Sequence, residues 1–218
     1  MGLLSDRDRQ VVGEQLVAIR QPVTLLLFTQ TFDAPETAVL ARQVLDEVAS
    51  LNDLVRVEEV NFILERDRAA QYGVEHIPSI VLLSGGEDTR MRFLGAPAGY
   101  EFMSLVEAVI LAGTTDSRLT PESRELIATH VTGVLDIQVF VTPTCPHCPR
   151  AVALAHRMAR EHTQITASCV EATEFMDLSR KFRVTGVPKT IVNGSVEILG
   201  ALPEDQFVRT VLGVPETA

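Results

Sequence analysis

Short apolar segments alternate along this chain with longer segments of helical spacing, and the whole pattern occurs twice. Three pairs of segments repeat in the same order about 110 residues apart: VTLLLFTQT (23–31) with IQVFVTPT (137–144), YGVEHIPSIVLL (72–83) with FRVTGVPKTIVN (182–193), and RFLGAPAGYEF (92–102) with EILGALPEDQF (197–207). Such ordered repetition indicates an internal duplication.

Each half predicts the same series of elements. Ser5 is a good N-cap for a first helix, and Thr120 occupies the equivalent place in the second half. Apolar strands and helices then alternate, and SGGED or VNGS provides a hairpin turn before the last strand. The predicted order is α-β-α-β-α-β-β-α, with the loop-like segment TTDSRL between the halves. We therefore predict an α/β fold of two tandem units, residues 1–117 and 118–218, each a four-stranded mixed sheet with helices on both faces.

Charge and hydropathy narrow the classes of partner. The net charge is −10, and residues 1–117 hold 9 basic and 18 acidic groups against 10 and 11 in residues 118–218. No dense basic stripe is present, so we predict no nucleic-acid partner. The apolar runs, such as residues 25–28, are too short to cross a membrane, and the charged start MGLLSDRDR has no apolar signal region. We expect a cytoplasmic protein without a membrane partner.

The residues with the clearest potential for chemistry lie in the stretch TCPHCP, residues 144–149. Three cysteines are too few for a structural disulfide framework, but Cys145 and Cys148 form a CxxC pair. Helix-compatible sequence follows Cys145 directly, so we predict that Cys145 lies at a helix N-terminus, where the dipole favours the thiolate. Pro146 then fits the first turn, and the i, i+3 spacing brings the two sulfurs together. The third cysteine, Cys169, is expected to be a small buried apolar residue on a strand.

His147 lies between the two cysteines. When protonated, it adds a positive charge that stabilises the thiolate further. A stabilised reduced form makes the disulfide a stronger oxidant, so we predict a couple less reducing than a CGPC-type site.

The residues around this pair carry a resemblance to a known family. FVTPTCPHCPRAV followed by RVTGVPK resembles the thioredoxin/glutaredoxin superfamily. MGLLSDRD, FLGAPAGYEF and FVTPTCPHCP together resemble the narrower family of protein disulfide oxidoreductases, glutaredoxin-like proteins with two thioredoxin-fold units. The same layout is similar to the N-terminal domain of the flavoprotein component of alkyl hydroperoxide reductase. The resemblance runs from Met1 to about Leu212.

This resemblance implies roles for individual residues. Cys145 is the attacking thiol, exposed at the turn, and Cys148 is the resolving thiol. Pro188 is a cis proline that faces the CxxC turn, and Val187 offers its backbone to an extended substrate segment. The implied activity is reduction or oxidation of protein disulfides, with no cofactor besides the Cys145–Cys148 disulfide. The implied partners are proteins with thiols or disulfides and a flavoprotein reductase as electron donor.

This chain departs from the family pattern in two places: the buried acid that transfers a proton is missing, and the first unit has no CxxC pair. Many thioredoxins have a buried acid six residues before the first cysteine, but Val139 stands there, so the proton must go elsewhere. In the first unit, Phe32 and Pro35 of TFDAPE align with the two cysteines. That unit therefore lacks thiol chemistry, and its role is structural or is to hold a peptide near Pro78.

Other functions stay open at this stage. One is an electron carrier from a flavoprotein reductase to a peroxiredoxin, and another is a peptide-binding or chaperone module with secondary redox activity. A zinc site needs two more ligands, and the remaining histidines and Cys169 form no ligand set, so we predict no metal. We expect solvent-exposed positions on the helix after the CxxC pair for the following residues: His156, His162, Arg150, Arg157 and Arg160.

Overall fold

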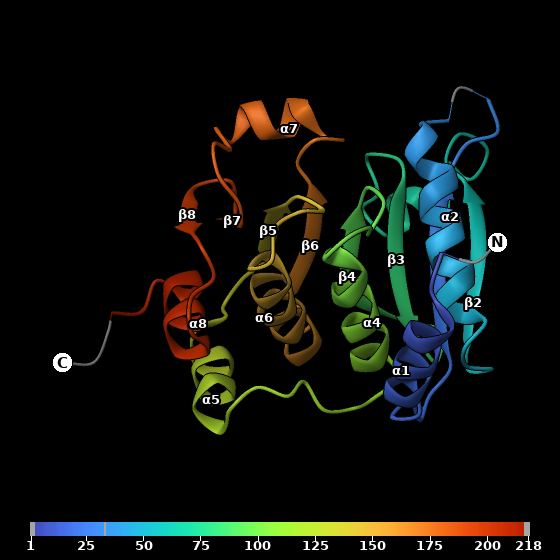
Figure 1. The fold of residues 1–218 in the computed structure, drawn as a ribbon. Helices are drawn as coiled ribbons and strands as arrows, with labels where there is room; N and C mark the ends of the chain where they lie inside the picture. Colours follow the sequence, from blue (N-terminus) through green and yellow to red (C-terminus); the bar gives the residue numbers. More distant parts are fainter. Residues whose placement is uncertain (1–2, 33, 216–218) are drawn as a thin grey trace.

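The computed structural model describes residues 3–32 and 34–215, so Met1, Gly2, Asp33 and the last three residues lie outside the described part. The predicted order α-β-α-β-α-β-β-α is confirmed in both halves (Figure 1). The first half contains α1 (Asp6–Leu16), β1 (Val23–Thr29), α2 (Glu36–Ala49), β2 (Val55–Asn61), α3 (Arg66–Gln71), β3 (Ser79–Ser84), β4 (Glu87–Leu94) and α4 (Glu101–Ala112). The second half contains α5 (Pro121–His130), β5 (Leu135–Val141), α6 (Cys148–Glu161), β6 (Ile165–Glu171), α7 (Met176–Lys181), β7 (Lys189–Val192), β8 (Val196–Leu199) and α8 (Glu204–Leu212).

The two first helices begin where the cap residues predict. The Ser5 side chain accepts a hydrogen bond from the backbone N–H of Asp8, and the Thr120 side chain accepts one from Ser123. Each bond satisfies a backbone donor that has no partner within its helix.

The two four-stranded sheets join into one sheet of eight strands, in the order β2-β1-β3-β4-β6-β5-β7-β8. The junction is a parallel pairing of β4 with β6, in which Met91 lies opposite Ala167 and Leu94 opposite Val170. Pairing these two edge strands removes one exposed edge from each unit. The first unit is therefore fixed to the second by backbone hydrogen bonds as well as by side chains.

Helices cover both faces of this sheet, as predicted. Alternate strand residues such as Leu25, Ile80 and Val139 face one continuous core, which α1, α2, α4, α5, α6 and α8 complete. On the opposite face α3 and α7 each cover a smaller core, one around Phe28 and one around Phe140. No helix among residues 3–32 and 34–215 is long and apolar enough to cross a membrane.

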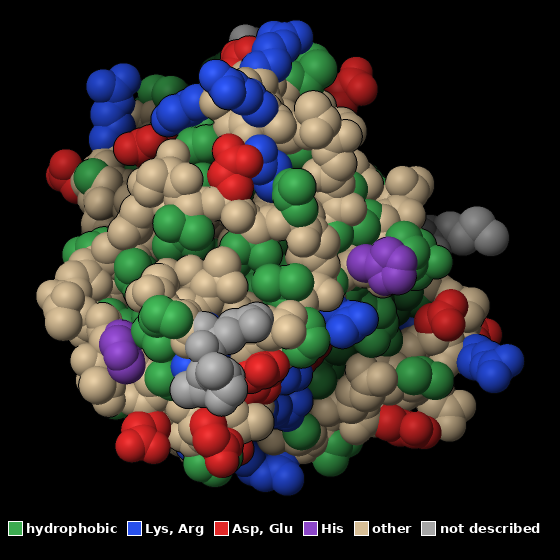
Figure 2. All heavy atoms as spheres, turned by 90° about the vertical axis from the view of Figure 1, so that its left-hand side faces the viewer, with side chains coloured by type: hydrophobic (Ala, Val, Ile, Leu, Met, Phe, Trp, Pro, Cys, Tyr) green, Lys and Arg blue, Asp and Glu red, His purple; other side chains and the backbone are tan. Residues whose placement is uncertain are grey.

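Charged side chains are unevenly spread over the second unit. Figure 2 views the side formed by β8 and α8 and shows Lys and Arg gathered at the end where α7 lies. Arg180 and Lys181 occupy the last turn of α7, and Arg183 follows it. The acidic first unit thus contrasts with a locally basic end of the second.

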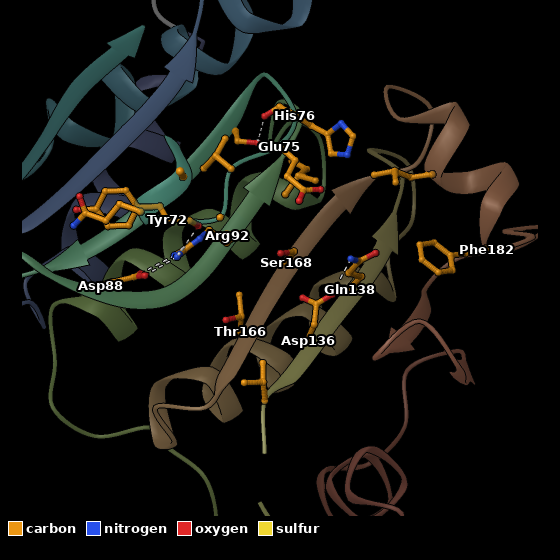
Figure 3. A pocket seen from close by; sticks show the side chains of 18 of the residues that line it. Tyr72, Glu75, His76, Asp88, Arg92, Asp136, Gln138, Thr166, Ser168 and Phe182 are labelled. Carbon is orange, nitrogen blue, oxygen red and sulfur yellow. Dashed lines mark hydrogen bonds and ion pairs between the residues drawn. The ribbon is translucent and has the colours of Figure 1, made fainter. Parts of the chain in front are cut away.

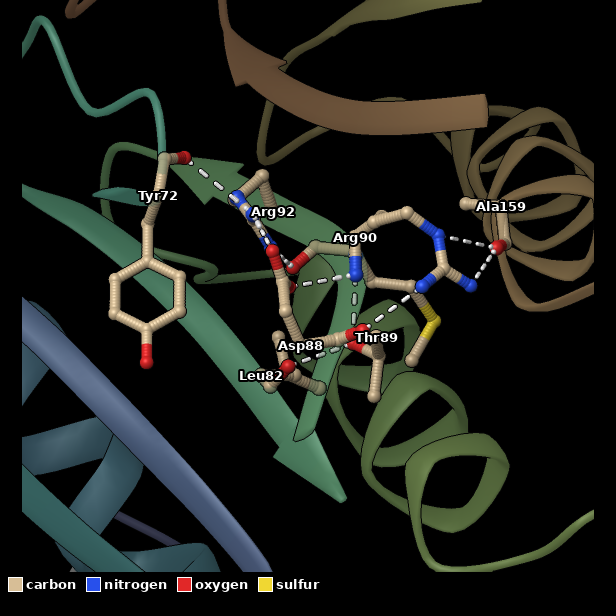
Figure 4. Close-up of polar contacts among 8 residues, drawn as sticks. Tyr72, Leu82, Asp88, Thr89, Arg90, Arg92 and Ala159 are labelled. Atoms are coloured by element: carbon tan, nitrogen blue, oxygen red, sulfur yellow. Dashed lines mark hydrogen bonds and ion pairs between the residues drawn. The ribbon is translucent and has the colours of Figure 1, made fainter. Parts of the chain in front are cut away.

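Polar contacts from the first unit hold the far end of α6 (Figure 4). The Arg90 guanidinium donates to the carbonyl of Ala159 over 3.2 and 2.8 Å, where helix carbonyls lack partners. Arg157 pairs with Glu107 at 2.6 Å, and Arg160 donates to a carbonyl of the first unit at 2.8 Å. The prediction that these two arginines form a solvent-exposed helix face is wrong, because α4 and β4 pack against that face of α6.

His156 is also buried rather than solvated, with 2% of its surface exposed. Its ring packs edge-on against Phe93 at a centroid distance of 5.1 Å, and Nε2 donates to the carbonyl of Arg92 at 3.3 Å. Burial, followed by the positive charge of Arg92, lowers the pKa of His156 to about 4 although that hydrogen bond acts in the opposite direction. The imidazole is therefore neutral at pH 7.

Because His156 is buried in its neutral form, we expect the free energy of unfolding to fall as the pH is lowered. The folded-state pKa lies below the ordinary value of 6.5, so the unfolded chain binds this proton first. Stability is complete above pH 6.5 and is lost as the pH falls toward 4; the loss between pH 7 and 5 is about 2 kcal/mol. Urea unfolding at both pH values measures it. His156→Phe should lack this component, and an equal pH dependence in that variant contradicts the assignment.

Candidate active site

The CxxC turn is placed by the end of β5 and the start of α6. Helix α6 begins at Cys148, with His147 as its N-cap, so the prediction that the helix starts directly after Cys145 is wrong. Cys145 lies in the preceding turn, where its N–H donates to the carbonyl of Thr142 at 3.1 Å. Pro149 rather than Pro146 consequently occupies the first turn of the helix, where a missing N–H costs no hydrogen bond.

Cys145 and Cys148 form a disulfide, with their Cα atoms 5.5 Å apart. Cys148 is fully buried, and 7% of Cys145 is exposed. The expectation of an exposed Cys145 is therefore wrong for the disulfide form, but Cys145 is the more accessible of the two. Cys148 is the first residue of α6, and Cys145 lies in the turn just before it, so both sulfurs lie at the N-terminal end of the helix.

The cis proline lies beside this turn. The Val187-Pro188 bond is cis, as the resemblance implies, and so is the equivalent Ile77-Pro78 bond of the first unit. Phe140 at the end of β5 pairs with Lys189 at the start of β7, so Pro188 and the turn after Val141 leave the sheet at the same end. Val187 is half-buried against the core beneath it.

A buried lysine supports the segment that leads to this proline, and sequence reasoning did not identify it. Lys189 is 4% exposed, and its ammonium group donates to the carbonyls of Phe182 and Arg183 at 2.8 and 3.2 Å. It also pairs with Glu197 at 2.8 Å. These bonds connect the end of α7 to β7 across the Val187-Pro188 corner.

The first unit has an apolar side chain at the position that Cys145 occupies in the second unit. Phe32 follows β1 as Cys145 follows β5, and 86% of it is exposed. Pro35 is the N-cap of α2, the counterpart of α6. Among residues 3–32 and 34–117 there is no cysteine, so this unit supplies surface and structure rather than thiols.

The first unit nevertheless touches the redox turn directly. Tyr100 donates its backbone N–H to the carbonyl of Pro143 at 2.9 Å, two residues before Cys145. Gly99 has a φ of 60° and lies so close that a Cβ atom there would overlap the Pro143 carbonyl. The loop from 95 to 100 therefore supports the turn that holds the CxxC pair.

Glu101 is the functional candidate that sequence reasoning missed. It opens α4, yet it is only 2% exposed, and burial raises its pKa although hydrogen bonds from Ser104 and Cys169 oppose the shift. Its Oε2 accepts from the Cys169 thiol at 3.6 Å, and Cys169 pairs in register with Val139. The carboxyl thus contacts Cys169, the register partner of Val139, the strand position where many thioredoxins have a buried acid.

A separate cavity of about 590 Å³ lies on the other sheet face, between α3 and α7 (Figure 3). Two polar residues line it from the strands at the junction: Arg92 of β4 and Ser168 of β6, which are register partners. Arg92 is held by Asp88 at 2.6 Å, while Asp136 accepts a hydrogen bond from Gln138. No cysteine lines the cavity, so it is distinct from the redox turn.

Comparison with known proteins places these features in a family context. Residues 135–213 match the family model described as a thioredoxin domain. The F component of alkyl hydroperoxide reductase from Escherichia coli is 27% identical over 179 residues, 82% of this chain and 32% of that protein. The chain therefore spans about a quarter to a third of the length of the curated relatives it matches.

Two solved structures match nearly the whole chain. The NTD_N/C domain of alkylhydroperoxide reductase AhpF from Enterococcus faecalis superposes with a TM-score of 0.89 at 28% identity, covering 95% of this chain and 99% of that one. A protein disulfide oxidoreductase from Aeropyrum pernix superposes with a TM-score of 0.87 at 27% identity, covering 98% and 96%.

Fold and site together define a thioredoxin-fold protein of two tandem units with one CxxC disulfide, in the second unit. Its resemblance to the protein disulfide oxidoreductases, and to the N-terminal domain of alkylhydroperoxide reductase AhpF, is confirmed.

Proposed function

We propose that this chain is a protein dithiol–disulfide oxidoreductase that works through Cys145 and Cys148. The observation that supports this most strongly is a disulfide at the start of α6 within a thioredoxin domain. The two cysteine residues differ in exposure, at 7% for Cys145 and 0% for Cys148, so an incoming substrate meets Cys145 first. That asymmetry supports Cys145 as the attacking thiol and Cys148 as the resolving thiol.

The reductase direction takes two exchange steps. The Cys145 thiolate attacks one sulfur of a substrate disulfide, forms a mixed disulfide and releases the first substrate thiolate. Cys148, once deprotonated, attacks the Cys145 sulfur, releases the second substrate thiolate and closes the Cys145–Cys148 disulfide. Two electrons have then passed to the substrate, and the same steps in reverse oxidise a dithiol.

The surrounding residues take supporting roles in this proposal. Pro146 and His147 shape the turn, and His147 when charged favours the thiolate. Val187 and Pro188 offer backbone to an extended substrate segment, because they leave the sheet beside the turn. The exposed Phe32 extends the contact surface at the same end of the sheet, where the second cis proline, the buried Pro78, also lies.

Glu101 is our candidate for the proton carrier. The resolving step requires a base for the buried Cys148 thiol, since thiolate is the nucleophile. Glu101 follows Tyr100, whose backbone N–H binds the Pro143 carbonyl of the turn, and burial raises the pKa of its carboxyl, which suits a group that takes up and gives back a proton. It comes from the first unit, which gives that thiol-free unit a part in the chemistry.

A reductase assay tests the proposal. With dithiothreitol as donor, the protein should accelerate insulin reduction, followed as turbidity. Reduced protein treated with iodoacetamide is the matched control: Cys145, the more accessible thiol of the pair, is blocked, and buried Cys169 is shielded in the folded state. An uncatalysed rate with the untreated protein contradicts the proposal.

A narrower possibility follows from the match to the Enterococcus faecalis domain: electron transfer from a flavoprotein reductase to a peroxiredoxin. A mixture of such a reductase, NADH, a peroxiredoxin and peroxide measures it directly. An increase in NADH oxidation when this protein is added supports the carrier role, and an unchanged rate counts against it. The location in the cytoplasm stays a prediction from the sequence.

A further inference from the structure

Cys169 takes no part in the disulfide, yet its thiol has a specific partner. It lies on β6 with 3% of its surface exposed, and its sulfur is 3.6 Å from Oε2 of Glu101. The contact joins a strand of the second unit to a helix of the first. Since buried polar groups are costly unless they are hydrogen-bonded, each of these two groups depends on the other.

The carboxyl of Glu101 has few donors. Ser104 donates its hydroxyl to Oε2 at 2.6 Å, and the Cys169 thiol donates to the same oxygen. Oε1 is buried and has no hydrogen-bond partner among the residues that the structure describes. The carboxyl is only 2% exposed and is hydrogen-bonded at one oxygen, so its orientation depends strongly on each of those two donors. Both hydrogen bonds favour the ionised carboxylate, whereas burial favours the protonated form.

Cys169 is suited to donate and unsuited to attack. Burial, then the charge of Glu101 and its hydrogen bond, raise the pKa of this thiol well above the ordinary value. Glu171, further along β6, is the other ionisable group that raises it. The sulfur therefore keeps its proton at neutral pH, which makes it a permanent donor rather than a second redox thiol.

We propose that Cys169 is a positioning residue for Glu101: its S–H group fixes the orientation of the carboxyl and helps to keep it ionised as the base for Cys148. The proposal rests on the dithiol–disulfide exchange proposed above. Cys169 is the register partner of Val139, the position on β5 where many thioredoxins have a buried acid. The Cys169 thiol on β6 and the Glu101 carboxyl on α4 therefore together supply the acidic group that β5 lacks.

Infrared spectroscopy tests the contact without any assay of activity. The chain has three cysteines and two are in the disulfide, so the S–H stretching band of the oxidised protein belongs to Cys169 alone. A hydrogen bond to an ionised carboxylate lowers the frequency of that band. We expect the band to rise in frequency as the pH is lowered and Glu101 takes up its proton. In Glu101→Gln the band should be at the higher frequency and independent of pH; an identical, pH-independent band in both proteins overturns the proposal.

The pH profile of exchange tests the functional consequence. Removal of the donor in Cys169→Ala should move the acidic limb of the profile to higher pH, with a rate about threefold lower on that limb, the equivalent of half a pH unit. Cys169→Ser retains a donor and should restore most of the wild-type profile. Ile165→Val, a small loss of buried volume on the same strand, controls for packing and should leave the profile in place.

The two failures are distinguishable. A folded Cys169→Ala variant with the wild-type acidic limb overturns the role of Cys169 while exchange itself persists. A wild-type protein without exchange activity overturns the proposed function, and the infrared band still reports whether the thiol and the carboxyl interact.

Discussion

Replacing Cys148 with serine is expected to convert the protein from a catalyst into a covalent trap for its substrates. Cys145 still attacks a substrate disulfide, but the fully buried partner that closes the disulfide is gone, so the mixed disulfide persists. Turnover in the insulin assay should fall on the order of 1,000-fold or more, as for removal of a reacting group. Adducts that disappear on adding dithiothreitol should appear on non-reducing gels.

Cys145→Ser is the matched variant for this experiment. It loses turnover to the same degree, but it should form no adduct, because the remaining sulfur at Cys148 is buried. Equal trapping by both variants would show that the order of attack is not the one inferred from exposure. Trapping by Cys145→Ser alone would reverse the roles of the two cysteines.

Much of this fold was accessible from sequence because its determinants are local. The internal repeat defines two copies of one element series, and apolar strands with capped helices identify each element. The cis bond at Pro188 followed from the resemblance and the repeat together. The spacing of Cys145 and Cys148 was enough to predict a CxxC redox pair, and the structure confirms the disulfide between them.

The interaction between the two units was not predictable from such patterns. Pairing of β4 with β6 is a contact between edge strands far apart in sequence, and nothing in either strand specifies its partner. His156 was expected to be exposed because a helix covering a sheet normally has one solvent face. In α6 the first unit covers part of that face, so the exposure of His156 depends on the junction.

Glu101 escaped sequence reasoning for a related reason. An acid in the first turn of a helix is favourable for the dipole alone, so its presence there signals nothing further. Only the three-dimensional structure shows that this helix start is buried against Cys169 and near the redox turn. The start of α6 was misplaced because Pro146 is compatible with a helical first turn, but Pro146 and His147 belong to the turn that precedes the helix.

Gly99→Ala is expected to be one of the most damaging single changes outside the cysteines. A Cβ atom at this position would overlap the carbonyl oxygen of Pro143 and lie 2.9 Å from its carbon, and the backbone has a φ of 60°. The two loops must separate, which breaks the bond from Tyr100 to that carbonyl. We expect a stability loss of about 3 kcal/mol, the sum of a steric, a conformational and a hydrogen-bond cost. Urea unfolding measures it, and the exchange rate at Cys145 should fall in the same variant.

Gly73→Ala separates these costs. Gly73 has a similar φ of 64°, but a Cβ atom there meets nothing within 4 Å, so the variant has only the conformational cost of about 1 kcal/mol. Its exchange rate should equal that of the wild type. The difference between the two variants then measures the close approach of the thiol-free unit to the redox turn. Equal losses of stability would mean that Gly99 serves only its backbone conformation and that the first unit does not support the turn at this point.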